Sequence, residues 1–165
     1  MPEAGGNSML RWLWLAVLVV VIDQATKIWA EAALRYAEPV ELLSWFNLTL
    51  LYNRGAAFSF LAGAGGWQRF LFLGIGVVAV TVIVLWLRRL RAQETTTAVG
   101  LALILGGAVG NLIDRAVYGH VVDFIDWHYG GWHWPAFNIA DAGITVGAVL
   151  VVLSGFRKQE ADSKS

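Results

Sequence analysis

Two aspartates on either side of an aromatic segment are the residues of this sequence best suited to catalysis. Asp123 follows the apolar pair Val121-Val122, and Asp141 lies three positions after Asn138 at the start of an apolar run. Two carboxyl groups at close range share one proton, so one can activate water while the other donates to a carbonyl oxygen. If the seventeen residues between them fold back, the pair predicts aspartic peptide-bond hydrolysis.

Each aspartate also has a purely structural explanation. Asn138 is a favourable N-cap, and an acid three positions later lies in the first helical turn, where the helix dipole stabilises its charge. Asp123 taken alone fits an ordinary loop residue. Position by itself leaves both explanations open beside the catalytic one.

Further ionisable and amide residues lie near the ends of apolar runs, where charge is costly and often functional. Asp23 and Lys27 are four residues apart with the acid first, which predicts an ion pair on one helix with a structural or supporting role. Asn111 and Arg115 have the same spacing, with Asp114 between them. For these three, a helix-end or ion-pair role competes with a role in holding substrate.

Other hydrolytic centres have weaker support. His120, His128 and His133 share one segment with Asp123 and Asp126, so the ligand types of a metal site are present. Their spacing does not match two ligands on one helix face, and the aromatic neighbours favour interfacial packing. Cysteine is absent, and so are HExxH, GxSxG and SxxK motifs. We therefore expect no metal and no other cofactor.

The composition places these residues in a membrane protein. Of the 165 residues, 58% are hydrophobic and only 15% are charged, and the mean hydropathy is +0.60. The formal net charge is zero, so the chain has no basic field that would attract nucleic acid.

Four runs are long enough to span a bilayer, which requires roughly 20 apolar residues. They are approximately Met9 to Ala33, Gln68 to Leu87, Thr95 to Ile113 and Ile139 to Phe156. We predict an all-α membrane protein, a bundle of four transmembrane helices in one domain over residues 1–165. The first run also has features of a secretory signal peptide, but Asp23 and Lys27 precede the candidate cleavage triplet Ala30-Glu31-Ala32 and favour a retained span.

The distribution of basic residues predicts the orientation. The basic residues between spans two and three are Arg88, Arg89 and Arg91, and those after span four are Arg157, Lys158 and Lys164. By the positive-inside rule both segments are cytoplasmic. Both termini are then inside, and residues 34–67 and 114–138 are outside. Because these outer segments carry most of the other polar residues, we expect the site at the outer face.

Two pairs of glycines predict close packing between helices. Gly106 and Gly110 in span three, and Gly143 and Gly147 in span four, have the spacing that lets helices approach closely in the bundle centre.

In the first outer segment, Leu48 to Tyr52 is a β-like run. Asn53-Arg54-Gly55 follows as a turn signal, and then Ala56 to Phe60. This order predicts a small hairpin or sheet, with Gly63 to Gly66 connecting to span two.

Five sequence blocks together resemble the motifs of lipoprotein signal peptidases, the bacterial type II signal peptidases. The blocks match in order and spacing over nearly the whole chain: Asp23-Gln24-Ala25-Thr26-Lys27, Asn53-Arg54-Gly55-Ala56-Ala57-Phe58, the block from Gly106 to Arg115, Val121-Val122-Asp123-Phe124, and Phe137-Asn138-Ile139-Ala140-Asp141.

The resemblance implies an aspartic endopeptidase of the bacterial inner membrane. Its active site would lie near the periplasmic face, with a β-cradle after the first span. Such enzymes remove the signal peptide from diacylglyceryl-modified prolipoproteins, cutting before the lipidated cysteine. The implied partners are therefore lipid-modified prolipoproteins, membrane lipid and globomycin-type inhibitors.

The resemblance also implies residue roles. Asp123 and Asp141 match the catalytic dyad. The residues that match the polar, substrate-binding positions around it are Asn53, Asn111, Arg115 and Asn138, and the residues with a structural or supporting role are Asp23, Lys27 and Asp114.

The alternative from another functional class is a small transporter or channel subunit. Asp23, Lys27, Asp123 and Asp141 would then form an ion path. Such a path needs ionisable groups spread across the bilayer depth, whereas these cluster toward one face. The sequence therefore favours the enzyme.

Overall fold

Four long helices form most of the molecule. The computed structural model describes residues 9–55 and 66–162, the side chains of 157–162 excepted. A short 3-10 helix, η1 (Met9–Trp12), leads into α1 (Leu13–Ala33), and α2 (Gln68–Arg89), α3 (Thr95–Val117) and α4 (Ile139–Asp162) follow. All four predicted runs are confirmed as helices long and apolar enough to cross a membrane.

The third helix is longer than the sequence predicted. It was expected to end at Ile113, but it continues to Val117. Asp114 and Arg115 therefore belong to the helix and not to an outer segment. Their charges do not end the helix because Asp114 pairs with Lys27 and Arg115 donates to a backbone carbonyl.

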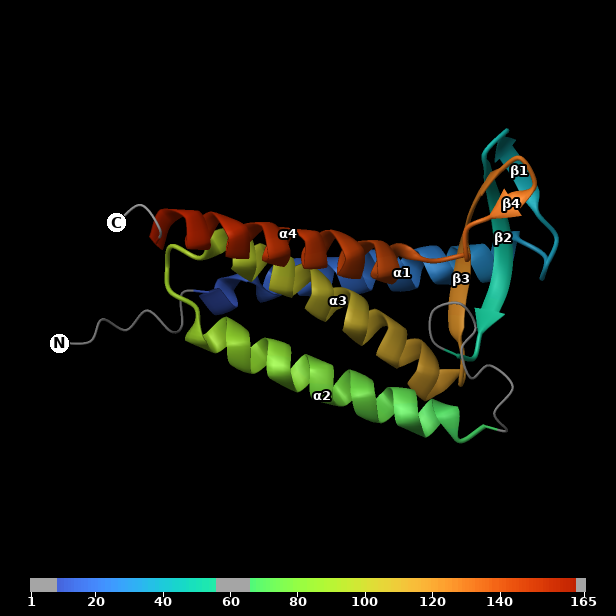
Figure 1. Ribbon diagram of the computed structural model, residues 1–165. Coiled ribbons are helices and arrows are strands. Elements are labelled where there is room, and N and C mark those ends of the chain that lie inside the picture. Colours follow the sequence, from blue (N-terminus) through green and yellow to red (C-terminus); the bar gives the residue numbers. More distant parts are fainter. Residues whose placement is uncertain (1–8, 56–65, 163–165) are drawn as a thin grey trace.

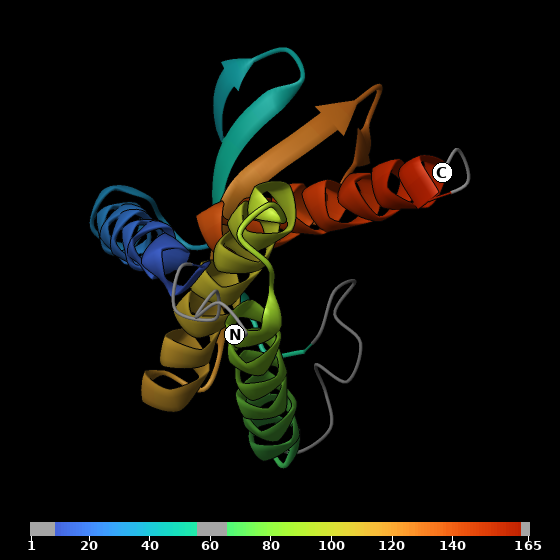
Figure 2. The same cartoon turned by 90° about the vertical axis from the view of Figure 1, so that its left-hand side faces the viewer.

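Helix α3 is the centre of the bundle and packs against α1, α2 and α4 (Figures 1 and 2). Its contact with α4 depends on glycine. A Cβ atom added at Gly100 would lie 2.7 Å from the carbonyl oxygen of Gly147, and one added at Gly107 would collide with the backbone of Ala140. The predicted close approach of spans three and four is therefore confirmed, since only small residues permit it.

The glycine pair named from the sequence has a different neighbour. Gly106 and Gly110 face α1, because an added Cβ would lie 2.7 Å from the oxygen of Ala16 and 2.5 Å from Asp23 Oδ2, respectively. Helix α4 is also less central than predicted, since much of its span is exposed. The spacing of the glycines predicted close helix packing, but it did not indicate which helix would pack against them.

We expect Gly106→Leu to destabilise the protein much more than Gly74→Leu. At Gly106 the new side chain meets Ala16 and Val19, whereas nothing lies within 4 Å of a Cβ at Gly74. Overpacking of this kind costs about 1 to 3 kcal/mol or more. Thermal unfolding of both variants in the same detergent measures the difference. Equal unfolding midpoints would show that the close α1–α3 contact does not determine stability.

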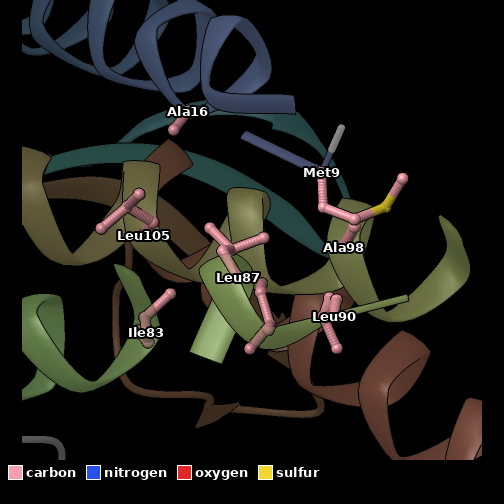
Figure 3. Close-up of a cluster of buried hydrophobic side chains, with 8 residues drawn as sticks. Met9, Ala16, Ile83, Leu87, Leu90, Ala98 and Leu105 are labelled. Carbon is pink, nitrogen blue, oxygen red and sulfur yellow. The ribbon is translucent and has the colours of Figure 1, made fainter. Parts of the chain in front are cut away.

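An apolar cluster joins the helices at the end of the bundle away from the sheet (Figures 1 and 3). Its buried members come from η1, α1, α2, the α2–α3 connection and α3: Met9, Ala16, Ile83, Leu87, Leu90, Ala98, Leu101 and Leu105. The opposite end of the bundle is thereby left for polar groups.

A four-stranded antiparallel sheet lies across that opposite end (Figure 1). The strands β1 (Val40–Leu43), β2 (Phe46–Asn53), β3 (Val121–Tyr129) and β4 (Trp132–His133) are neighbours in that order. The predicted β-like run is confirmed within β2.

The pairing of β2 differs from a local hairpin. Its described partners are β1 and β3, with Leu51 opposite Asp123 and Asn53 opposite Val121. The hairpin partner expected at residues 56–60, and most of the glycine connection at 63–66, lie outside the described residues. The sequence did not indicate β3, because its partner is some seventy residues away.

Candidate active site

The chain returns from the sheet to the start of α4 through a pair of backbone hydrogen bonds. Phe137 N donates to Ile125 O at 3.1 Å, and Ile125 N donates to Phe137 O at 2.9 Å. Phe137, two residues before the helix, is thus fixed to β3, the strand that carries Asp123. Asp141, in the first turn of α4, is brought to the same place.

Two side chains satisfy the backbone donors at the start of α4. Asn138 Oδ1 accepts from Asp141 N at 3.0 Å, which confirms the predicted N-cap. Asp23 Oδ1, from α1, accepts from Ala140 N at 2.9 Å. These bonds fix the beginning of the helix, and hence Asp141, relative to α1.

Both aspartates line one cavity of about 870 Å³ between the sheet, α3 and α4. Three of the four predicted substrate-binding residues line it as well: Asn53, Asn111 and Arg115. Much of the remaining wall is apolar or aromatic, including Leu51, Trp127, Trp134, Phe137, Ile144 and Val146. A mainly apolar cavity with a few converging polar groups is typical of a ligand site.

Asn138 has a different place from the one expected. It is 0% exposed and lies behind the cavity wall, where its Nδ2 donates to Asp123 Oδ1 at 2.8 Å and to Val122 O at 3.2 Å. Its hydrogen bonds are therefore to the protein. The N-cap bond draws the side chain inward, which a sequence motif does not reveal.

Asn111 makes the corresponding contact with the second aspartate. Its Nδ2 donates to Asp141 Oδ1 at 2.7 Å, while its Oδ1 accepts from Lys27 Nζ at 3.0 Å. Asp123 and Asp141 thus each accept a hydrogen bond from a different asparagine side chain.

Arg115 connects three elements at the edge of the cavity. Its Nη2 donates to Gly55 O at 3.0 Å, just beyond β2. Its guanidinium also lies over the ring of Phe72 in α2, with Cζ 5.2 Å from the ring centroid. A fixed cation therefore lines the same cavity as the two aspartates.

A buried polar cluster supports the site from α1. Lys27 Nζ lies 2.8 Å from both Asp23 Oδ2 and Asp114 Oδ2, which confirms the predicted Asp23–Lys27 ion pair. Asp114 Oδ2 also accepts from Val122 N in β3 at 3.1 Å. Gln24, whose role the sequence did not indicate, donates to Asp114 Oδ1 at 2.8 Å. The cluster joins α1, α3 and β3.

Burial raises the pKa of Asp123 from the ordinary carboxyl value of 3.8 to about 7. The nearby carboxyl of Asp141 raises it further, whereas hydrogen bonds from Asn53 and Asn138 act in the opposite direction. Near neutral pH, a large fraction of Asp123 therefore carries a proton that it can donate.

The three histidines do not converge on a common point. His133 Nδ1 lies 2.8 Å from Asp126 Oδ1, and its ring stacks on that of His128 at 5.1 Å. His120 instead packs against Tyr52, with ring centroids 4.3 Å apart. Among the side chains of residues 9–55 and 66–156, no group of three or more His, Asp or Glu is placed to hold a metal ion.

Several cavity residues were not predicted individually. They are mainly aromatic residues of the outer segments and α4 residues beyond the first turn: Tyr36, Trp127, Trp134, Phe137, Ile144, Thr145 and Val146. The richness of the outer segments in tryptophan was the available signal, but it did not separate cavity residues from residues at the membrane interface.

Comparison with known proteins identifies the family. The family model described as "Signal peptidase (SPase) II" matches residues 15–157. The chain is 55% identical to the lipoprotein signal peptidase of Paraburkholderia phytofirmans over 94% of its length and 90% of that protein. It is also 55% identical to the lipoprotein signal peptidase of Pseudomonas putida, over 98% of its length and 95% of that protein.

Solved structures agree with this fold. One described as a bacterial membrane enzyme superposes with a TM-score of 0.81 at 31% identity, covering 90% of this chain and 89% of that one. A second with the same description gives 0.76 at 32% identity, covering 87% and 91%. With the family match and the relatives over nearly the full length, these similarities show that the chain belongs to the signal peptidase II family, the membrane proteases that process the signal peptides of lipoproteins.

Proposed function

We propose that this protease is of the aspartic type and that Asp123 and Asp141 are its catalytic dyad. The observation that carries the proposal is their arrangement. Both line one cavity, they come from different elements, and each accepts a hydrogen bond from its own asparagine, Asn138 or Asn111. Two carboxyl groups held in this way share the acid and base roles of peptide hydrolysis.

The reaction then follows from general acid–base chemistry. Asp141 accepts a proton from water as the water oxygen bonds to the scissile carbonyl carbon, and Asp123 donates its proton to the carbonyl oxygen. The tetrahedral intermediate breaks at its C–N bond. Asp141 returns its proton to the leaving amine nitrogen, and the new carboxyl group forms as Asp123 regains a proton from the intermediate's hydroxyl.

The substrate class is a diacylglyceryl-modified prolipoprotein, cut before its lipidated cysteine. Ile144, Thr145 and Val146 of α4 form part of the cavity wall, and Val146 is exposed on the surface of the spanning helix. A lipid-anchored chain diffusing in the bilayer would reach the dyad past this wall. Asn53, Asn111 and Arg115 would form hydrogen bonds with its peptide groups. In a mainly apolar site these groups would otherwise have no hydrogen-bond partner, because water is excluded.

The proposed location is the bacterial inner membrane, with both termini cytoplasmic and the sheet forming a periplasmic cradle over the site. The arginines at the end of α2 support it, because that end of the bundle is opposite the sheet (Figure 1). Membrane lipid and globomycin-type cyclic peptides are further expected partners.

The purified protein is expected to cleave a prolipoprotein signal peptide only when the cysteine carries diacylglycerol. The lipid anchor brings the scissile bond to the depth of the dyad, and the unmodified peptide lacks this positioning. Mass spectrometry of both peptides after incubation with equal enzyme decides the result. Equal cleavage of the unmodified peptide would contradict the proposed substrate class.

We expect kcat/KM to fall as the pH rises through about 7. The pKa of Asp123 is raised to about 7, so the acid form is lost above that pH and two carboxylates remain without a proton donor. This descending limb of the pH profile reports the coupled pair Asp123 and Asp141 and not one residue alone. Initial rates at low substrate between about pH 5 and 9 measure it. A rate that stays constant to the alkaline end would exclude Asp123 as the acid.

A further inference from the structure

The orientation of the Asn111 side chain is set by an obligate donor. An amide group has nearly the same shape in either orientation, so its neighbours decide which way its oxygen points. Lys27 Nζ lies 3.0 Å from Asn111 Oδ1, and an ammonium group only donates hydrogen bonds. The oxygen of Asn111 must therefore face Lys27, which directs its NH₂ group to Asp141 at 2.7 Å.

Asn138 is oriented in a different way. Its Oδ1 accepts from the backbone N–H of Asp141, so its NH₂ group faces Asp123 whatever the state of Lys27. A second donor, Asn138 Nδ2, also reaches Asn111 Oδ1, at the longer distance of 3.3 Å. Lys27 thus contacts the amide that donates to Asp141, whereas the amide that donates to Asp123 is oriented by the backbone of α4.

The three donors of the Lys27 ammonium are all used. Two go to Asp23 and Asp114 at 2.8 Å, and the third goes to Asn111. The side chain is only 3% exposed, and Lys27 is not among the residues that line the cavity. Lys27 therefore affects the reaction only indirectly: through Asn111, through its charge, or through Asp23, which holds the start of α4.

We propose that Lys27 is a positioning residue for the reaction: through Asn111 it holds Asp141 as the carboxylate that accepts the proton from water. With the amide reversed, two oxygen atoms would face each other, an arrangement that only a protonated Asp141 would relieve. The inference rests on the proposed aspartic mechanism and adds to it a reason why the two aspartates differ.

The test has to separate this role from the structural role of the ion pairs. The charged groups around Asp141 are Lys27 and Asp23 from α1, Arg115 from α3 and Asp123 from β3. Replacing Lys27 alone leaves two buried carboxylates unpaired. The double variant Lys27→Met/Asp114→Asn avoids this, because one carboxylate remains and the cluster keeps the net charge of −1 that one ammonium and two carboxylates give.

The matched control is Asp114→Asn, which disturbs the same cluster but retains the Lys27–Asn111 contact. We measure kcat and KM separately against pH for both variants, with a diacylglyceryl-modified peptide. Relative to the control, we expect kcat of the double variant to fall about 10- to 100-fold with KM nearly unchanged. We also expect the acid limb of its kcat profile to move to higher pH by about one unit, because Asp141 without an oriented donor keeps its proton longer.

The same kcat and the same acid limb in the double variant and the control would overturn the proposal, and so would a loss confined to KM. Asn111→Ala provides a second measurement if the double variant does not fold. This variant removes the amide and leaves the ion pairs of Lys27 in place. The acid limb of its kcat profile should therefore move to higher pH in the same way. An acid limb that does not move would contradict the proposal. Failure of the aspartic mechanism itself is distinguishable, because Asp141→Asn would then retain turnover.

Discussion

Replacement of either Asp123 or Asp141 by asparagine is expected to lower kcat by about 10²- to 10⁴-fold. Asparagine keeps the shape of the side chain and an oxygen that accepts the hydrogen bond from Asn138 or Asn111. It neither accepts the proton from water nor shares a proton with its neighbour. Because the two residues act as one unit, the double variant should lose little more than either single variant.

The fold should survive these changes, which makes the loss interpretable. The raised pKa of Asp123 means that the native state binds this proton more tightly than the unfolded chain does. The stability it contributes is greatest below pH 3.8 and is lost as the pH rises to about 7. At about pH 8, Asp123→Asn should therefore unfold at the same temperature as the parent or a higher one.

Asp126→Asn is the matched control for the dyad variants. Asp126 lies on the same strand, but it bonds to Thr49 and His133 and is not among the residues that line the cavity. We expect its turnover to remain close to that of the parent protein. Cleavage of a diacylglyceryl-modified peptide by monodisperse protein measures all variants, and normal turnover in either dyad variant would falsify the aspartic mechanism.

Asp23→Ala is expected to cause a large loss of stability. Asp23 is 0% exposed, accepts from the backbone of Ala140, and pairs with Lys27 at 2.8 Å. Its removal leaves the Ala140 N–H without its acceptor at the start of α4 and takes away one of the carboxylates that balance the ammonium. Breaking a buried pair in this way costs about 3 to 5 kcal/mol, a fall in Tm of about 6 to 20 °C.

Glu31→Ala is the control for this change. Glu31 lies on the same helix, but it is exposed, and exposed substitutions alter stability by about 0.5 kcal/mol or less. Thermal unfolding of both variants in the same detergent gives the comparison. Similar midpoints for the two variants would show that the buried cluster contributes little to holding α1 against α3 and α4.

The buried cluster also explains the charges within the spans. Asp23, Lys27 and Asp114 are paired with one another at the end of the bundle that carries the sheet. They are not distributed along the helices, as an ion path across the membrane would require. Their described contacts connect α1, α3, β3 and the start of α4, so their position suits the support of a site at that end.

Features that depend on residues close together in the chain could be predicted from the sequence. Four apolar runs predict four helices, because the thickness of the bilayer sets the length of a span. The i,i+4 spacing of Asp23 and Lys27 predicts their ion pair, and Asn138 before Asp141 predicts an N-cap, since both contacts lie within one helical turn. The structure confirms each of these.

The sequence motifs also placed Asn53, Asn111, Arg115, Asp123 and Asp141 in one set, and the structure brings all five to one cavity. That grouping came from the resemblance to a family, because hydropathy and spacing left a structural role open for most of them. The variants Asp123→Asn, Asp141→Asn and Asn111→Ala test what three of these residues do in the reaction.

How distant segments of the chain meet could not be predicted from local patterns, because it depends on tertiary packing. Asp123 lies on a strand because β3 pairs with β2, and Asp141 approaches it because Phe137 pairs with Ile125. Gly106 faces α1 and not α4, and Asn138 points inward to Asp123. Periodicity within a segment shows which residues share a face, but the partner of that face depends on how the whole chain packs.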